Sequence, residues 1–242
     1  DMGVLLCAGC VLVALGPAAA VFFLSIVKQA HLIVLMILSA FCWIISISVA
    51  GVLWTIIPPA REMYILTIIE AVLLQEAMRW GFYRLCIKAE KGLTVIMHQK
   101  LFSPRNFSSV LASGLGFGVA YCLLMHGGVL AAASGPATYY IEACSGVSFF
   151  LMSAINCMYF VFLQVNFSII AINGYLERSK LKVGFVVVAH LVASLTTIVN
   201  LQGDGCVPSF IVLFIICLIV GGVSGRIVYT QALGSMSLSH RN

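Results

Sequence analysis

The residues of this chain that could carry chemistry inside an apolar stretch are two glutamates, an arginine and a histidine. Glu76 and Arg79 lie three positions apart, next to Gln75, and Glu70 lies shortly before them. Residues three apart share one face of a helix, so we expect this carboxylate and guanidinium to pair. Ionisable groups are costly within a membrane, which indicates either a self-paired structural cluster or a proton or ion path. We expect the cluster, because the chain has few other charges that could continue a relay.

His190 lies in the middle of a second apolar stretch. A lone histidine in a membrane is commonly a hydrogen-bonding residue between helices, because both ring nitrogens need partners where water is scarce. We therefore predict that His190 bonds to polar side chains of a neighbouring helix. The candidate partners are Asn156, Gln164 and Asn166.

The apolar stretches lack the aspartates that an intramembrane aspartyl protease needs. Such an enzyme uses two aspartates, whereas this chain has Asp1 and, in a short glycine turn, Asp204. The segment Gly222-Val223-Ser224-Gly225 is similar to the serine turn of a rhomboid-type protease, but the histidine that follows it is His240, in the tail. The histidines do not cluster, and the zinc motif His-Glu-x-x-His is absent. We predict no catalytic residue, no bound metal and no cofactor.

These residues lie within long apolar blocks that predict the fold. Hydrophobic residues make up 62% of the 242 residues and charged residues 9%, far below the roughly one quarter of a soluble domain. A helix needs about 20 apolar residues to cross the hydrocarbon, and it satisfies its own backbone hydrogen bonds there. We predict an all-α membrane protein in which residues 1–242 form one domain of seven spanning helices, at about 3–27, 32–57, 63–86, 107–130, 148–173, 183–201 and 207–228.

The basic residues predict the orientation of this bundle. Five of the 13 Lys and Arg residues lie in the third connection, three lie in the fifth and Lys28 lies in the first, whereas the second connection has Arg61 alone and the fourth and sixth have none. Loops rich in Lys and Arg stay in the cytosol, so the N-terminus should face the lumen or exterior and the C-terminus the cytosol. Arg79 then lies near enough to the cytosolic end of its helix to extend its charge toward the headgroups. The asymmetry and the anionic cytosolic leaflet explain the net charge of +5, so we predict no nucleic-acid partner.

Seven of the nine cysteines lie within apolar blocks or at their ends. We expect these cysteines, Cys122 and Cys157 among them, to act as small apolar side chains. Cys144 and Cys206 lie near the luminal side, where oxidising conditions allow a disulfide.

Gly114 and Gly118 lie four positions apart in the fourth apolar block, and Gly116 lies between them on a second face. Small residues at a spacing of four let another helix approach to backbone contact, where packing attraction in lipid is strongest. We predict that the face of Gly114 and Gly118 mediates helix assembly. A bulky residue there should reduce recovery of the chain with its partners.

Several short motifs, in order along the chain, resemble one known family. They are Leu15-Gly16-Pro17-Ala18, Ala40-Phe41-Cys42-Trp43, Leu73-Leu74-Gln75-Glu76 followed by Arg79, Ser113-Gly114-Leu115-Gly116-Phe117-Gly118, Ala189-His190-Leu191 and Gly221-Gly222. Together they resemble the Aph (anterior-pharynx-defective) scaffold subunit family of γ-secretase, an intramembrane protease complex, over nearly the whole chain.

The resemblance implies a non-catalytic scaffold subunit with seven helices and a luminal N-terminus. Its partners would be presenilin, which supplies the catalytic aspartates, nicastrin and the presenilin-enhancer subunit, in contact with membrane lipids. The complex would cleave substrates of the Notch and amyloid-precursor types. The protein would reside in the endoplasmic reticulum and Golgi, and at the plasma membrane and endosomes as part of the complex.

Two positions depart from the pattern of this family. Cys122 takes the third position of a glycine series that Gly114 and Gly118 begin. His190 matches the family's histidine in the sixth helix, but Gln164 stands where the fifth helix has another. A glutamine can hydrogen-bond but cannot titrate, so a role that requires two histidines is not expected here.

The same residues permit a second interpretation. The chain could be an independent transporter or channel for small solutes or ions, with Glu70, Glu76 and His190 lining the path. Copurification separates the two interpretations, because a scaffold purifies with partner subunits and a transporter purifies alone.

Overall fold

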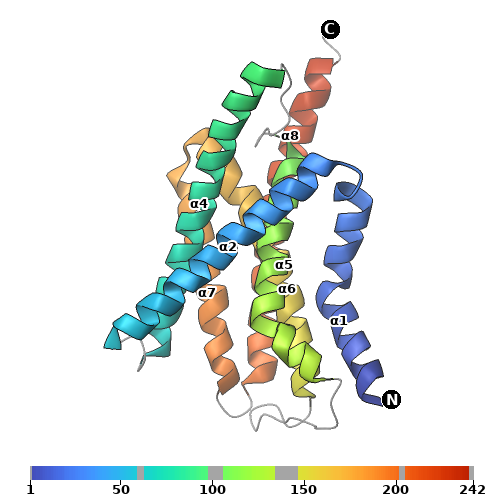
Figure 1. Ribbon diagram of the computed structural model, residues 1–242, viewed down its shortest axis with the longest axis vertical. Coiled ribbons are helices and arrows are strands. Elements are labelled where there is room, and N and C mark those ends of the chain that lie inside the picture. Colours follow the sequence, from blue (N-terminus) through green and yellow to red (C-terminus); the bar gives the residue numbers. More distant parts are fainter. Residues whose placement is uncertain (1, 59–62, 98–105, 134–146, 202–204, 240–242) are drawn as a thin grey trace.

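The computed structural model describes residues 2–58, 63–97, 106–133, 147–201 and 205–239. Over these residues every regular element is a helix (Figure 1), which confirms the all-α fold class. In chain order the elements are α1 (Met2–Val21), the π-helix η1 (Phe22–Ile26), α2 (Ala30–Ile56), α4 (Tyr64–Met97), α5 (Phe107–Ala132), α6 (Phe149–Glu177), α7 (Lys180–Thr196), the 3-10 helix η3 (Thr197–Leu201) and α8 (Cys206–Ser239).

Six of the described helical segments are long and apolar enough to cross a membrane, so the chain is a multi-pass membrane protein. They are Gly3–Ile26, Ala30–Ile56, Phe107–Met125, Phe149–Glu177, Lys180–Asn200 and Cys206–Leu233. α4 is not among these six, because Glu70, Glu76 and Arg79 lie in its first half. It is nevertheless 34 residues long, or about 50 Å. It continues the 63–86 block to Met97, so the third connection begins as helix.

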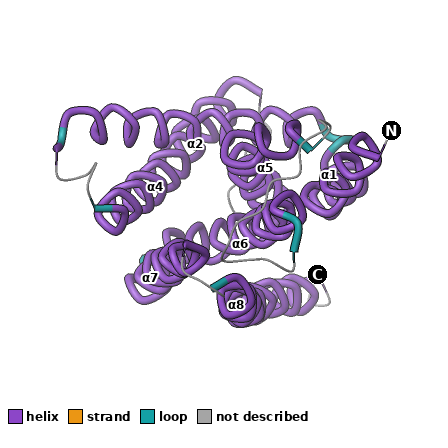
Figure 2. The backbone as a smooth tube through the Cα atoms, turned by 90° about the horizontal axis from the view of Figure 1, so that it is seen from below, coloured by secondary structure: helices purple, strands orange, loops and turns teal. Residues whose placement is uncertain are grey.

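α6 is the central helix of the bundle. It packs against α1 and α5 on one side and against α7 and α8 on the other (Figure 2). In an 18-residue apolar stretch of its span 72% of the residues are buried, against 17% in the corresponding stretch of the first span and 22% in that of the span that contains α7. α2 crosses α5 obliquely and also packs against α4 (Figure 1). The outer helices therefore turn apolar side chains such as Leu5 and Leu12 toward their surroundings, as contact with lipid permits.

Glycines allow α5 to approach two helices closely. A Cβ atom on Gly114 would lie 2.8 Å from the Cα of Val165 on α6, and one on Gly118 would lie 3.1 Å from the Cα of Val161. The predicted small face therefore packs against α6 of the same chain. Gly116 faces α2 instead, where a Cβ atom would lie 2.1 Å from the carbonyl oxygen of Met36. This is the tightest glycine contact among the described residues.

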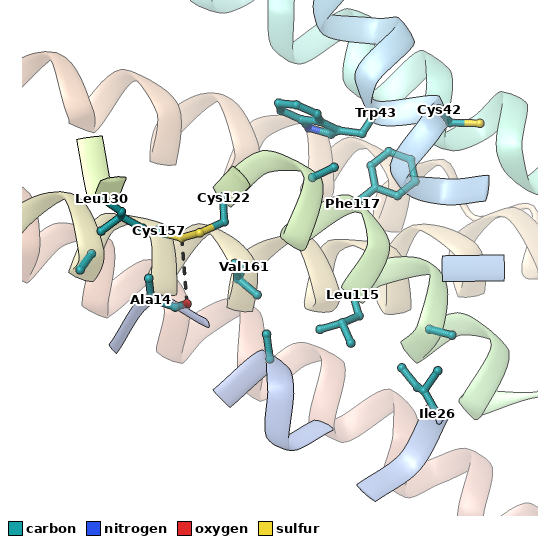
Figure 3. Packing of buried hydrophobic residues seen from close by; sticks show 14 of the residues in the cluster. Ala14, Ile26, Cys42, Trp43, Leu115, Phe117, Cys122, Leu130, Cys157 and Val161 are labelled. Atoms are coloured by element: carbon teal, nitrogen blue, oxygen red, sulfur yellow. Dashed lines mark hydrogen bonds between the residues drawn. A yellow bond between two sulfur atoms is a disulfide. The ribbon is translucent and has the colours of Figure 1, made fainter. Parts of the chain in front are cut away.

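A disulfide joins Cys122 of α5 to Cys157 of α6 (Figure 3). The expectation that these two cysteines act as separate small apolar residues is therefore wrong. The small face brings the two backbones together, so the Cα atoms of Cys122 and Cys157 lie 5.3 Å apart, within the usual range for a disulfide. The bridge lies in the main apolar core, with Ala14, Leu115 and other buried residues of α1, α2, α4, α5 and α6 around it. Cys206 is also disulfide-bonded, and Cys144, its expected partner, lies outside the described residues.

Candidate functional site

Arg79 on α4 lies at the centre of a buried polar network, and each of its N–H groups has an acceptor. Nε–H donates to Glu76 Oε2 at 3.1 Å, and Nη2 donates to Glu76 Oε1 at 3.3 Å and to the side-chain oxygen of Gln164. Nη1 donates to the Gln164 carbonyl oxygen at 3.4 Å and to the Ser168 hydroxyl. The guanidinium carbon lies 4.5 Å from the centre of the Phe117 ring, a cation–π contact. An arginine has five such donors, and the protein satisfies all of them.

This arrangement corrects one expectation. Arg79 does not extend its charge toward the headgroups at the helix end, because its side chain is fully buried and its donors are engaged within the bundle. Pairing with Glu76 and stacking on Phe117 compensate for the loss of water around the guanidinium.

Glu76 links Arg79 of its own helix to His190 of α7. The Nδ1 atom of His190 lies 2.7 Å from Glu76 Oε1, and both side chains are buried. The imidazole ring also packs against Phe167 of α6, with 5.1 Å between the ring centres. The carboxylate therefore connects α4 to α7.

Two glutamines complete the network. Gln75 Oε1 accepts a hydrogen bond from Trp43 Nε1 of α2 at 3.0 Å and from Gln164 Nε2 at 3.4 Å. The same Gln164 Nε2 lies 3.5 Å from Nε2 of His190. Hydrogen bonds between side chains thus connect α2, α4, α6 and α7, four helices that are separate along the chain.

The donors and acceptors of this network fit a neutral His190 with its proton on Nδ1. Nδ1–H then donates to Glu76, and Nε2 accepts from the amide of Gln164, whose oxygen accepts from Arg79. A second proton on Nε2 would point at the Gln164 NH2 group, donor against donor. With His190 neutral, the charges of Glu76 and Arg79 cancel, which limits the cost of burial. The arrangement is suited to holding helices together.

Glu70 and two of the expected partners of His190 lie outside this network. The Oε1 atom of Glu70 and the Oδ1 atom of Asn156 are buried and have no hydrogen-bond partner among the described residues. Asn166 accepts from the Ser224 hydroxyl of α8 and donates to the carbonyl oxygen of Phe162 at 2.7 Å. Ser224 therefore joins helices rather than standing in a protease-like turn.

Three members of the network were not selected from the sequence. Ser168 follows Gln164 by one helical turn, so the periodicity of α6 could have identified it. Trp43 and Phe117 carry no such signal, because an aromatic residue in an apolar block is ordinarily a core residue.

A second polar contact was also missed. Nδ1 of His126 on α5 lies 2.7 Å from the Ser153 hydroxyl of α6, and its Nε2 lies 3.4 Å from the Tyr121 hydroxyl. This contact lies on the α5–α6 interface that the disulfide also crosses. In the part of the chain that the structure describes, no three His, Cys, Asp or Glu side chains come together as a metal site.

Known proteins are similar to this chain along nearly its whole length. A family model described as Aph-1 protein matches residues 5–231. The chain belongs to the Aph-1 family. Among Aph-1 relatives, "Gamma-secretase subunit APH1-like" of Arabidopsis thaliana is 33% identical over 239 residues, 96% of each chain. "Gamma-secretase subunit Aph-1" of Drosophila melanogaster is 27% identical over 219 residues, 90% of this chain and 91% of the relative. "Gamma-secretase subunit Aph-1b" of Danio rerio is 29% identical over 215 residues, 85% and 83% of the two chains.

The match to the Aph-1 family confirms the resemblance carried by the sequence motifs. Every residue of the polar network lies within the matched range, from Trp43 to His190. The network is thus part of the Aph-1 region of the chain.

Proposed function

We propose that this Aph-1 protein is a non-catalytic scaffold subunit of a γ-secretase-like intramembrane aspartyl protease complex. The match over residues 5–231 carries the proposal, together with relatives that are named γ-secretase subunits. The aspartate inventory supports it, because Asp1 and Asp204 lie outside the apolar blocks and aspartyl chemistry needs a pair at one site. Another subunit would therefore supply the catalytic aspartates.

The partners in this proposal are a presenilin, which brings the aspartates, a nicastrin and a presenilin-enhancer subunit. The complex would cleave membrane proteins of the Notch and amyloid-precursor types. It would assemble in the endoplasmic reticulum and Golgi and act at the plasma membrane and endosomes. The buried network of Arg79, Glu76 and His190 would give the scaffold a fixed helix arrangement on which the partners pack.

The proposal includes seven spans with a luminal N-terminus. α4 would be the additional span, and its charges do not oppose this, because Glu76 and Arg79 neutralise each other inside the bundle. The connections that hold Lys28 and Lys180 would then lie in the cytosol.

The small face of α5 would support assembly indirectly, by holding the fold of this subunit together. Gly114, Gly118 and Cys122 contact α6 of the same chain. Bulk on this face would therefore reduce partner recovery by displacing α6. Two residues depart from the family pattern, and local contacts would compensate for both. Cys122 forms a disulfide, and Gln164 forms hydrogen bonds with Gln75 and Arg79.

Copurification tests the scaffold proposal. The tagged chain, extracted from its own membranes in a mild detergent, should bring down presenilin-, nicastrin- and enhancer-like subunits in comparable amounts. The recovered complex should cleave a membrane substrate, and replacing the presenilin aspartates should abolish cleavage without changing recovery. Purification of the chain alone would contradict the proposal and favour the transporter interpretation.

Cysteine accessibility tests the topology. In a background without the free cysteines, Gln29→Cys and Lys180→Cys should react with an impermeant maleimide from the cytosolic side. Ser148→Cys and Val207→Cys should react from the luminal side. If Gln29→Cys and Ser148→Cys are labelled from the same side, the seven-span arrangement is wrong.

A further inference from the structure

A cavity of about 780 Å³ lies at the connection between α6 and α7. Its walls are residues 80–91 of α4, the end of α6 and the first turn of α7. The volume is in the range of about 300–1,000 Å³ that is typical of small-ligand pockets. The buried network of Glu76 and Arg79 does not line this cavity, so it is a separate feature of the protein.

Five basic side chains surround the cavity, and no acidic side chain among the described residues lines it. They are Arg84, Lys88, Lys91, Arg178 and Lys180. The Lys and Arg ion pairs in the described ranges use other basic residues, namely Arg79 and Lys182. Five like charges around one space repel each other unless an anion enters. The electrostatics of the cavity therefore favour a multiply charged anionic ligand.

One of these cations occupies a position where the backbone favours glycine. Arg178 has φ 56° and ψ 30° and is the one non-glycine residue with positive φ in the described part of the chain. It ends α6 in a Schellman motif, in which Ser179 N–H donates to the Gly174 carbonyl at 2.9 Å. Glycine adopts this left-handed conformation without steric cost. The chain thus carries a cation at the cavity despite an unfavourable backbone conformation.

The remaining walls suit the level of lipid headgroups. Trp80, Tyr83 and Tyr175 line the cavity, and the two tyrosine rings pack with 5.1 Å between their centres. Trp and Tyr are enriched at the membrane–water boundary. α7 also begins at the cavity, with Ser179 as its N-cap, and the N-terminus of a helix attracts phosphate groups.

We propose that this cavity binds the phosphorylated headgroup of an anionic membrane lipid. The five cations hold the phosphate oxygens, and the tyrosines and Trp80 contact the glycerol and upper acyl region. Basic pockets between membrane helices on the cytosolic side suit such headgroups. The cytosolic leaflet follows from the proposed topology, but the binding itself does not depend on the proposed function and can be measured on the isolated chain.

Equilibrium binding to the full-length chain in a neutral detergent tests this inference. The probes are a fluorescent phosphatidylinositol bisphosphate, a phosphatidylcholine with the same acyl chains, and soluble inositol trisphosphate. The phosphoinositide should bind and the phosphatidylcholine should not. The soluble headgroup should compete more weakly, because it lacks the acyl chains. Equal affinity for the soluble headgroup would overturn the assignment to a lipid.

Two variants connect the binding to the cavity. Arg178→Gly should weaken phosphoinositide binding about fivefold, while the chain unfolds at the same temperature as the wild type or higher. The triple change Lys88→Gln, Lys91→Gln and Lys180→Gln should weaken binding on the order of a hundredfold. Arg226→Gln removes an exposed cation of α8 that does not line the cavity and should leave binding unchanged.

Wild-type affinity in both cavity variants would refute the proposal. So would equal binding of phosphatidylcholine and the phosphoinositide. If the cavity variants lose a partner subunit while lipid binding stays intact, the cavity belongs to an acidic segment of that partner and the lipid proposal is wrong.

Discussion

The imidazole Nδ1 of His190 lies 2.7 Å from Oε1 of Glu76, although the two residues are 114 positions apart. This contact joins α7 to α4 at the point where Arg79 neutralises the same carboxylate. A short hydrogen bond to a buried carboxylate fixes both the ring orientation and the position of its proton. The histidine therefore acts as a connector between helices in this protein.

Replacements of His190 should show how much each of its two ring nitrogens contributes to stability. His190→Ala should destabilise the folded chain by about 1–3 kcal/mol, because Glu76 loses a donor in a buried site. His190→Asn should retain more stability than His190→Gln, since the Asn amide nitrogen takes the place of Nδ1, which bonds to Glu76. The Gln amide takes the place of Nε2, which makes the longer contact of 3.5 Å. The unfolding temperatures of the three variants in detergent give their order of stability.

The same variants separate a structural role from proton handling. Protease activity per assembled complex, measured against pH, should have the same profile for the wild type and for His190→Asn. Normal assembly combined with a selective loss of the pH response in His190→Gln would show that His190 moves a proton.

Arg79 and Glu76 should behave as a coupled pair. Arg79→Met should destabilise the chain by about 3–5 kcal/mol, because it leaves the Glu76 carboxylate buried and unpaired. The double change Arg79→Met with Glu76→Gln should recover part of that loss, since no charge then remains. Arg79→Lys should not restore stability fully, because an ammonium has three donors and cannot replace the five bonds of the guanidinium. Simple additivity of the two single changes would contradict the coupling.

Glycine substitutions on α5 should follow the distances to neighbouring helices. Gly116→Ala should be the most harmful, because its Cβ would lie 2.1 Å from the Met36 carbonyl oxygen, a backbone atom. Gly118→Ala should cost less, with its nearest atom at 3.1 Å, and overpacking of this kind costs about 1–3 kcal/mol. Gly127→Ala on the same helix is the control, because nothing lies within 4 Å of its Cβ position. Yield of folded chain by size-exclusion chromatography reports the ranking, and equal yields for all three variants would contradict it.

The disulfide should be detectable and stabilising. In protein prepared without reductant, Cys122 and Cys157 should resist alkylation after unfolding and should react once reductant is added. Cys122→Ala should lower the free energy of unfolding by about 4 kcal/mol, because the bridge closes a segment with a sequence separation of 35. Cys42→Ala removes a buried cysteine that is free and should cost less. Alkylation of both thiols before reduction would show that the bridge is absent.

The sequence by itself predicted the helical class, the approximate ranges of the helices and the pairing partners within one helix. Apolar blocks of membrane length leave a helix as the structure that satisfies its backbone in lipid. The proximity of Glu76 and Arg79 follows from the period of a single helix. Short motifs in order along the chain also predicted the family. Such motifs can be identified from residue types and spacing, without knowledge of contacts.

The tertiary structure decided which helices meet. Three features join segments that are far apart in the sequence. They are the hydrogen bond between His190 and Glu76, the disulfide between Cys122 and Cys157, and the five cations around one cavity. In water, an apolar stripe shows which face of a helix turns inward. In lipid, the outward face is as apolar as the inward one, so the pattern does not select a partner. Helix pairing here depends on small residues, buried hydrogen bonds and charge, whose geometry exists in the folded chain alone.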